Sequence, residues 1–193
     1  MPHRAAQEDR LIALAQSSAW LMPALRAVRA LGLAQWCIGA GAIRNLVWDS
    51  LHGHPTPTPL SDVDVAFFDK QDLTPERDAR LQAQLQQGLP ELPWEVTNQA
   101  GVHLWFESCF GHAVAPLHSL EEAVASWPEY ATAVGLTLDA AGHIRIIAPY
   151  GLDDLFAMRV RRNPARVSVE TYRERLASKR YQERWPGVTV LSA

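Results

Sequence analysis

Two stretches, Trp36-Cys-Ile-Gly-Ala-Gly-Ala-Ile-Arg-Asn45 and Leu60-Ser-Asp-Val-Asp-Val-Ala-Phe-Phe68, decide the fold of this chain. The first predicts a short strand, a glycine turn over residues 39–41 and a helix, and the second predicts a strand that carries Asp62 and Asp64. Side chains at positions i and i+2 of a strand point to the same face, so the two carboxylates should stand side by side. Such a pair can hold a divalent cation while backbone N–H groups of the turn receive phosphate oxygens.

The apolar residues that alternate with these aspartates predict the buried side of the same strand. Val63, Val65 and Phe67 should face a core, away from the carboxylates. The simpler interpretation of Asp62 and Asp64 is a solvated strand face beside a loop. We favour the metal site because the glycine turn and the apolar flanks accompany the pair.

The composition of the 193 residues predicts a globular protein with one domain. Hydrophobic residues make up 48%, which excludes a disordered chain, and no apolar run is long enough to span a bilayer. The two cysteines, Cys37 and Cys109, provide no disulfide framework, and the first residues lack the apolar stretch of a signal peptide. We therefore expect a cytoplasmic protein that does not enter a membrane.

Charge is distributed unevenly along the chain. Residues 159–193 contain nine Lys and Arg against three Asp and Glu, whereas the preceding 158 residues contain nine basic and eighteen acidic residues. The basic C-terminal segment could pair with the acidic body or offer a phosphate-binding surface, and the first interpretation is favoured because charge runs are usually solvated faces. The net charge of −3 and the lack of a basic patch studded with aromatic residues argue against strong RNA binding.

The remaining pattern predicts an α/β (α+β) fold in which helices flank a small mixed β-sheet. We expect a helical N-terminal extension over residues 1–32, a core motif region over 33–98 and the basic segment over 159–193. Periodicity predicts helices over 6–31 (two helices), 42–52, 73–87, 119–127, 151–156 and 169–180, and strands over 35–38, 94–98, 135–138, 143–147 and 158–162. Residues 102–110 have no clear period.

The glycine turn, the helix that follows it and the Asp-x-Asp strand together resemble the polymerase-beta-type nucleotidyltransferase superfamily. The segment is most similar to the head of the CCA-adding and poly(A) polymerase group, in which Gly-Gly-x-x-Arg-Asp precedes the paired aspartates. Nearly the whole chain resembles a bacterial family of nucleotidyltransferase-like proteins, through pieces such as Trp94-Glu-Val-Thr-Asn-Gln-Ala100 and Pro149-Tyr-Gly-Leu-Asp-Asp-Leu155. Two positions depart from the pattern: Ala40 replaces a Gly or Ser, and Asn45 replaces the Asp that follows the Arg.

The resemblance implies a set of site residues. Asp62 and Asp64 would bind Mg²⁺ or Mn²⁺, and a third carboxylate on a neighbouring strand, matched here by Glu95, would help to bind the metal beside the attacking hydroxyl. The turn of Gly39, Ala40 and Gly41 would bind the phosphates of a nucleoside triphosphate (NTP).

Three of these positions leave alternatives open. Glu95 could instead be an exposed strand residue, with Asn98 as the competing candidate. Arg44 could contact a phosphate or base near the turn, or form a helix-surface ion pair, for example with Asp49. Trp48 is expected to pack in the core, and a base-stacking platform is the less favoured alternative.

The resemblance therefore implies an Mg²⁺-dependent transfer of a nucleoside monophosphate from an NTP to an acceptor, with release of pyrophosphate. The acceptor could be a small molecule, a protein or an RNA end. The main alternative is a nucleotide-binding or regulatory module that kept the fold and lost turnover. Metal-dependent phosphohydrolysis is a weaker third possibility.

Overall fold

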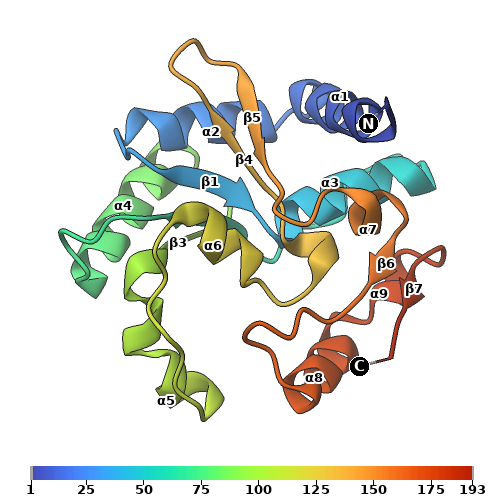
Figure 1. Ribbon diagram of the computed structural model, residues 1–193. Coiled ribbons are helices and arrows are strands. Elements are labelled where there is room, and N and C mark those ends of the chain that lie inside the picture. The colour runs from blue at the N-terminus through green and yellow to red at the C-terminus, as the bar shows by residue number, and fades with distance from the viewer. Residues whose placement is uncertain (1, 193) are drawn as a thin grey trace.

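The computed structural model describes residues 2–192, and within them a mixed sheet of five strands forms the centre of the molecule (Figure 1). The order across the sheet is β3-β2-β1-β4-β5. Strands β2 and β3 run parallel, and the other neighbouring pairs are antiparallel. The strands are β1 (Trp36–Gly39), β2 (Val63–Phe67), β3 (Trp94–Asn98), β4 (Gly135–Leu138) and β5 (Ile144–Ile147). This architecture confirms the predicted α/β fold class.

Helices surround the sheet, and a small parallel pair of strands, β6 (Arg159–Val160) and β7 (Thr189–Val190), lies beside the C-terminal helices (Figure 1). The α-helices are α1 (Pro2–Ser17), α2 (Leu21–Ala30), α3 (Gly41–His52), α4 (Pro75–Gly88), α5 (Phe106–Phe110), α6 (Leu120–Ala125), α7 (Asp153–Phe156), α8 (Val169–Lys179) and α9 (Tyr181–Arg184). Two 3₁₀ segments are η1 (Gln99–Leu104) and η2 (Tyr130–Thr132).

The two faces of the sheet pack against different helices because strand residues alternate between them. The larger core contains Ile38 of β1 together with buried residues of α1, α2, α3 and α4. Val63, Val65 and Phe67 of β2 are also fully buried in this core, as the sequence predicted. The opposite face contributes Cys37 to a smaller core with α6. The carboxylates that alternate with the core residues of β2 therefore lie on the side of the sheet that α6 covers.

Two predicted strands differ in detail, and the stretch without a clear period forms helical turns. Asp62 directly precedes β2 instead of lying within it, although Asp64 is in the strand. The ambiguous stretch 102–110 forms the end of η1 and then α5. The strand predicted over 158–162 shortens to the two residues of β6, because its partner β7 is equally short.

No single helix among residues 2–192 has the length and apolar character to cross a membrane. The first two helices, His3–Ser17 and Leu21–Ala30, meet those criteria as a pair, with a bend of 87° between them.

Candidate active site

The glycine turn connects the end of β1 to the start of α3, and its three residues have different constraints. A Cβ on Gly39 would lie 2.5 Å from a ring carbon of Trp127 and 2.8 Å from the carbonyl oxygen of Val134, so this position requires glycine for close packing. Ala40 adopts a positive φ of 53°, which is rare for a residue with a side chain. A Cβ on Gly41 would lie 3.5 Å from Nη2 of Arg44 and 3.8 Å from Oδ1 of Asp62, at ordinary van der Waals distance, so Gly41 faces these two side chains.

The N-terminus of α3 presents backbone donors at this turn. The first backbone hydrogen bond of the helix runs from the N–H of Arg44 to the carbonyl of Ala40, at 3.1 Å. The N–H groups of Gly41, Ala42 and Ile43 precede that bond, and no side chain of the described residues caps the helix at Ala40. Because Ala40 and Gly41 line a cavity of about 300 Å³, these donors and the helix dipole favour an anion there.

Three carboxylates line the same cavity from the sheet. Asp64 of β2 lies directly opposite Glu95 of β3 in the parallel register, and Asp62 lies at the entry to β2. Burial, followed by repulsion from Asp62 and Glu95, raises the pKa of Asp64 to about 7. The structure thus brings together the carboxylates that were predicted as metal ligands, in a site where their charges oppose one another.

These carboxylates have suitable chemistry for a hard divalent cation. Their oxygens are the donors that Mg²⁺ and Mn²⁺ prefer. The pKa of Asp64 is raised first by burial and then by repulsion from Asp62 and Glu95, and a cation would offset that repulsion. Among residues 2–192, no group of three His, Cys, Asp or Glu side chains is arranged to hold a metal ion by itself. Mg²⁺ is commonly held by one or two carboxylates together with phosphate oxygens of the substrate. Asp62 and Asp64 fit that type of site.

Arg44 also lines the cavity, and it is buried, with 4% of its surface exposed. It donates from Nε and Nη2 to the Oδ1 of Asn45, at 3.2 and 2.7 Å. The guanidinium lies over three aromatic rings, with centroids 5.0–5.5 Å away: Trp48, Tyr181 and Trp185. Because Arg44 is buried and lines the cavity, the alternative of a helix-surface ion pair is wrong.

The proposed partner of that ion pair has a different role. The carboxylate of Asp49 accepts hydrogen bonds from the N–H and hydroxyl of Thr58, at 2.7 and 2.6 Å, and from the indole N–H of Trp185 at 2.7 Å. His54 lies 3.0 Å from the same carboxylate. Asp49 therefore connects the proline-rich loop and the C-terminal segment to α3.

Asn98, the alternative to Glu95, is a structural residue. Its Nδ2 donates to the carbonyls of Asp69 and Asp72, at 2.7 and 3.0 Å, and its Oδ1 accepts from the N–H groups of Asp69 and Ala100, at 3.1 and 3.2 Å. The buried amide thus fixes the loop after β2. Glu95 is exposed and lines the cavity, whereas Asn98 is not among the described residues that do so.

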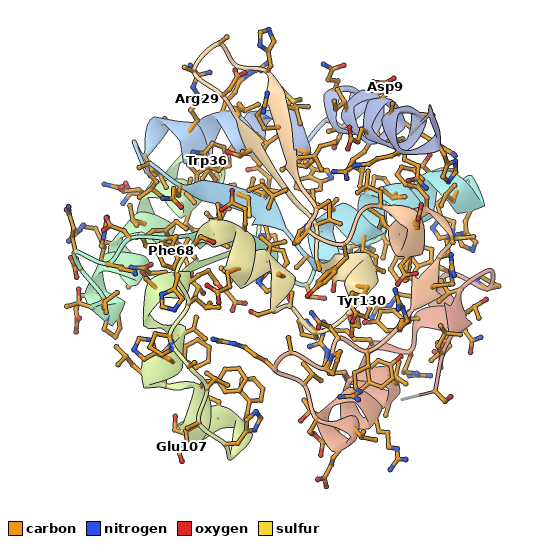
Figure 2. All side chains as sticks on the ribbon, viewed as in Figure 1. Asp9, Arg29, Trp36, Phe68, Glu107 and Tyr130 are labelled. Atoms are coloured by element: carbon orange, nitrogen blue, oxygen red, sulfur yellow. The ribbon has the colours of Figure 1, made fainter. Side chains whose placement is uncertain are left out.

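The basic C-terminal segment contributes Arg175 and Lys179 of α8 to the cavity. Arg175 also forms an ion pair with Glu129, with 3.0 Å between Nε and Oε1. The basic segment thus pairs with an acidic residue of the body and also lines the carboxylate cavity, and phosphate binding by this segment stays a prediction. In Figure 2, the label Tyr130 marks the segment η2, which lies between the sheet and the C-terminal helices.

The described residues that line the cavity thus include equal numbers of acidic and basic side chains. The acidic ones are Asp62, Asp64 and Glu95, and the basic ones are Arg44, Arg175 and Lys179. A ligand that combines phosphate groups with a bound divalent cation matches both sets, with the cation at the carboxylates and the phosphates at the basic side chains.

Sequence reasoning did not single out Trp127, Glu129, Arg175 or Lys179 as site residues. Trp127 is the last residue of the predicted helix 119–127, and it lines the cavity through tertiary packing. Glu129 does not line the cavity itself but pairs with Arg175, which does. The one sequence signal for Arg175 and Lys179 was the basic charge of the last 35 residues, together with their spacing of four on a predicted helix.

Comparisons with known proteins agree with this geometry. A family model described as "Nucleotidyltransferase" matches residues 26–190, whereas no curated protein matched the sequence. An NMR structure of a protein that reveals a CCA-adding enzyme head domain aligns with a TM-score of 0.80 and 30% sequence identity, over 96% of each chain. A tRNA-processing enzyme in an apo form aligns with a TM-score of 0.52 and 17% identity, which shows the fold alone; 88% of this chain covers 42% of that enzyme. The family match and the 30% identical relative show that this chain belongs to the nucleotidyltransferase family.

Proposed function

We propose that this nucleotidyltransferase moves a nucleoside monophosphate from an NTP to an acceptor, with the help of Mg²⁺ or Mn²⁺, at the cavity between β2 and α8. One observation carries the proposal: three carboxylates and three basic side chains line one cavity into which the N-terminus of a helix opens. The acceptor oxygen would form a bond to the α-phosphorus while the bond from that phosphorus to the bridging oxygen breaks, and pyrophosphate leaves.

Each wall of the cavity has a separate task in this proposal. Asp62 and Asp64 hold the cation, which when bound neutralises phosphate charge and polarises the α-phosphorus. The N–H groups of the first turn of α3 receive phosphate oxygens, and the missing side chain of Gly41 lets these oxygens approach the backbone between Arg44 and Asp62. Arg44 supplies a fixed positive charge in the cavity, because its aromatic neighbours and Asn45 hold it in place.

Glu95 is proposed to act on the acceptor side of the site. It is exposed, it lies on the strand next to Asp64, and it points into the same cavity. A carboxylate there would favour loss of the proton from an acceptor hydroxyl and would interact with the cation beside it. This placement differs from that of Asp64, whose burial suits it to the nucleotide side.

The relatives support an NTP as the donor, since one of them contains a CCA-adding enzyme head domain. The acceptor stays open among small molecules, proteins and RNA ends. The sequence-based predictions of a cytoplasmic location and of no strong RNA binding also stay predictions. The charge balance of the cavity supports a compact phosphate ligand there, without requiring a long nucleic-acid partner.

The competing function is a nucleotide-binding module without turnover. The observation in its favour is that, among residues 2–192, no three His, Cys, Asp or Glu side chains are arranged to hold a metal ion by themselves. Such a module would bind NTPs through the basic side chains of the cavity and would release no pyrophosphate.

Incubation with each labelled NTP, Mg²⁺ or Mn²⁺ and a cell extract separates the two functions. Transfer of the label from the α-phosphate to an extract component, with release of pyrophosphate, is the expected result. Binding of NTP without pyrophosphate release, with extract or without it, would establish the binding module instead. Release of inorganic phosphate in place of pyrophosphate would identify a phosphohydrolase.

A further inference from the structure

A buried carboxylate outside the predicted site organises the basic side chains that line the cavity. These side chains, Arg44, Arg175 and Lys179, are called the basic wall below. Glu129 has 1% of its surface exposed and lies between α6 and η2. Its Oε1 accepts from the Nε of Arg175 at 3.0 Å and from the hydroxyl of Tyr181 at 3.2 Å. Its Oε2 accepts from the hydroxyl of Thr132 at 3.1 Å. The carboxylate therefore connects η2 to both C-terminal helices.

The backbone on either side of Glu129 is also fixed. Glu129 forms an antiparallel bridge with Arg162, and the N–H of Tyr130 donates to the carbonyl of Arg161 at 3.2 Å. The N–H of Asn163 donates to the carbonyl of Pro128 at 2.8 Å. These two hydrogen bonds make up the bridge, and they fix the backbone at Glu129 through contacts outside α8.

Two arginines on the cavity wall depend on this carboxylate. Arg175 bonds to Glu129 directly, and Arg44 lies over the ring of Tyr181, whose hydroxyl donates to Glu129. A buried ion pair contributes little net stability, because the desolvation of both charges offsets their attraction. The arrangement that the pair imposes on the wall is therefore its more important consequence.

We infer that Glu129 is a positioning residue that holds Arg175 against the phosphate groups of the nucleotide, and this inference rests on the proposed function. An arginine side chain that is free in solution has many rotamers, and ordering it on binding would weaken affinity. Glu129 orders Arg175 before the nucleotide arrives. The role requires the position of the carboxylate and not merely its charge.

Two substitutions test position and charge separately. Glu129→Gln keeps the size of the side chain and removes its charge, and Glu129→Asp keeps the charge and withdraws the carboxylate from Arg175 by one methylene. Asp154→Asn is the matched control, because Asp154 is also a buried carboxylate in an ion pair with arginine. Its partners, Arg159 and Arg161, lie outside the cavity. All three should lower the melting temperature.

Calorimetric titration with inorganic tripolyphosphate in the presence of Mg²⁺ measures the affinity of the basic wall without a nucleobase or an acceptor. We expect both Glu129 variants to bind about tenfold more weakly than the wild type, the scale for losing a partner that orients a ligand-binding group. Asp154→Asn should bind like the wild type. In an Arg175→Ala background, Glu129→Asp should have little further effect, because the group that it orients is gone.

Wild-type affinity in Glu129→Asp would overturn the inference, and that variant decides the question if Glu129→Gln does not fold. An undiminished effect of Glu129→Asp in the Arg175→Ala background would also overturn it. A wild-type protein that binds neither tripolyphosphate nor any NTP would instead overturn the proposed function, and the inference with it.

Discussion

The indole of Trp127 occupies the space that a side chain on Gly39 would need, with a ring carbon 2.5 Å from the position of a Cβ. The carbonyl oxygen of Val134, the residue before β4, closes the same space at 2.8 Å. The first glycine of the motif is therefore a packing requirement between the sheet and the segment that follows α6. Gly41, two residues later, lines the cavity, and a Cβ there would lie no closer than 3.5 Å to the nearest side chain, that of Arg44.

Gly39→Ala should destabilise the fold by about 1–3 kcal/mol, because the ring of Trp127 or the backbone at Val134 has to shift. Urea denaturation of the variant and the wild type measures the difference. Gly88→Ala is the control, since a Cβ on Gly88 meets nothing within 4 Å and the residue lies in α4. An unfolding free energy for Gly39→Ala equal to that of the wild type would show that Trp127 moves without cost.

Gly41→Ala should leave the unfolding free energy within about 1 kcal/mol of the wild type, because glycine and alanine differ by about that amount in a helix. The new methyl group would stand 3.5 Å from Nη2 of Arg44 and 3.8 Å from Oδ1 of Asp62, in the space proposed for a phosphate. We expect affinity for NTP to fall about tenfold or more, which corresponds to 1.4 kcal/mol. Calorimetric titration of the folded variant with ATP and CTP provides the measurement; unchanged affinity for both would place the phosphates elsewhere.

The raised pKa of Asp64 predicts a pH dependence of stability. Asp64 has a pKa of about 7 in the folded chain, against an ordinary value of 3.8, so the folded protein binds this proton more tightly than the unfolded protein. The resulting stabilisation is complete below the ordinary pKa and is lost as the pH rises through about 7. Asp64→Asn has no such proton, so its melting temperature should rise relative to the wild type between about pH 5 and pH 8.

Melting curves in EDTA, across that pH range, test the prediction without a bound cation. Addition of Mg²⁺ at the higher pH should raise the melting temperature of the wild type more than that of Asp64→Asn. A difference between the two proteins that stays constant with pH would show that Asp64 titrates normally in the folded chain.

Glu95→Gln should separate catalysis from nucleotide binding. The substitution keeps the size of the side chain and removes the charge proposed to act beside the acceptor. Release of pyrophosphate should fall by about 10²-fold or more, while NTP affinity stays near that of the wild type. Equal turnover in Glu95→Gln and the wild type would make Glu95 an ordinary residue of the strand surface.

The sequence predicted the parts of this fold that depend on local patterns. The turn at Gly39–Gly41 and the helix after it follow from glycine spacing and 3.6-residue periodicity. The face of Asp64 follows from two-residue alternation against the buried Val63 and Val65. These features need no knowledge of the rest of the chain, because neighbouring residues determine them.

The positions of the basic side chains in the cavity depend on contacts between distant segments, which a single sequence does not reveal. Arg175 and Arg44 are 131 positions apart, yet Glu129 and Tyr181 bring them to the same wall. Arg44 is one residue for which sequence-based prediction was limited in this way. The sequence left Arg44 open between a phosphate or base contact and a helix-surface ion pair, and it did not reveal that the C-terminal Tyr181 and Trp185 pack against the guanidinium.

The central claim is tested most directly by an assay of pyrophosphate release. The assay compares the wild type with Asp62→Asn and Asp64→Asn, and it uses each of the four NTPs with and without Mg²⁺. The extract that contains the labelled acceptor is supplied in every assay, and Asp69→Asn is the control because Asp69 follows the far end of β2 and pairs with Arg77. We predict metal-dependent release by the wild type and Asp69→Asn, and loss of release by about 10²-fold or more in both cavity variants. Release that needs no divalent cation, or that persists at the wild-type rate in Asp62→Asn and Asp64→Asn, would contradict the assignment of this cavity as the site of nucleotidyl transfer.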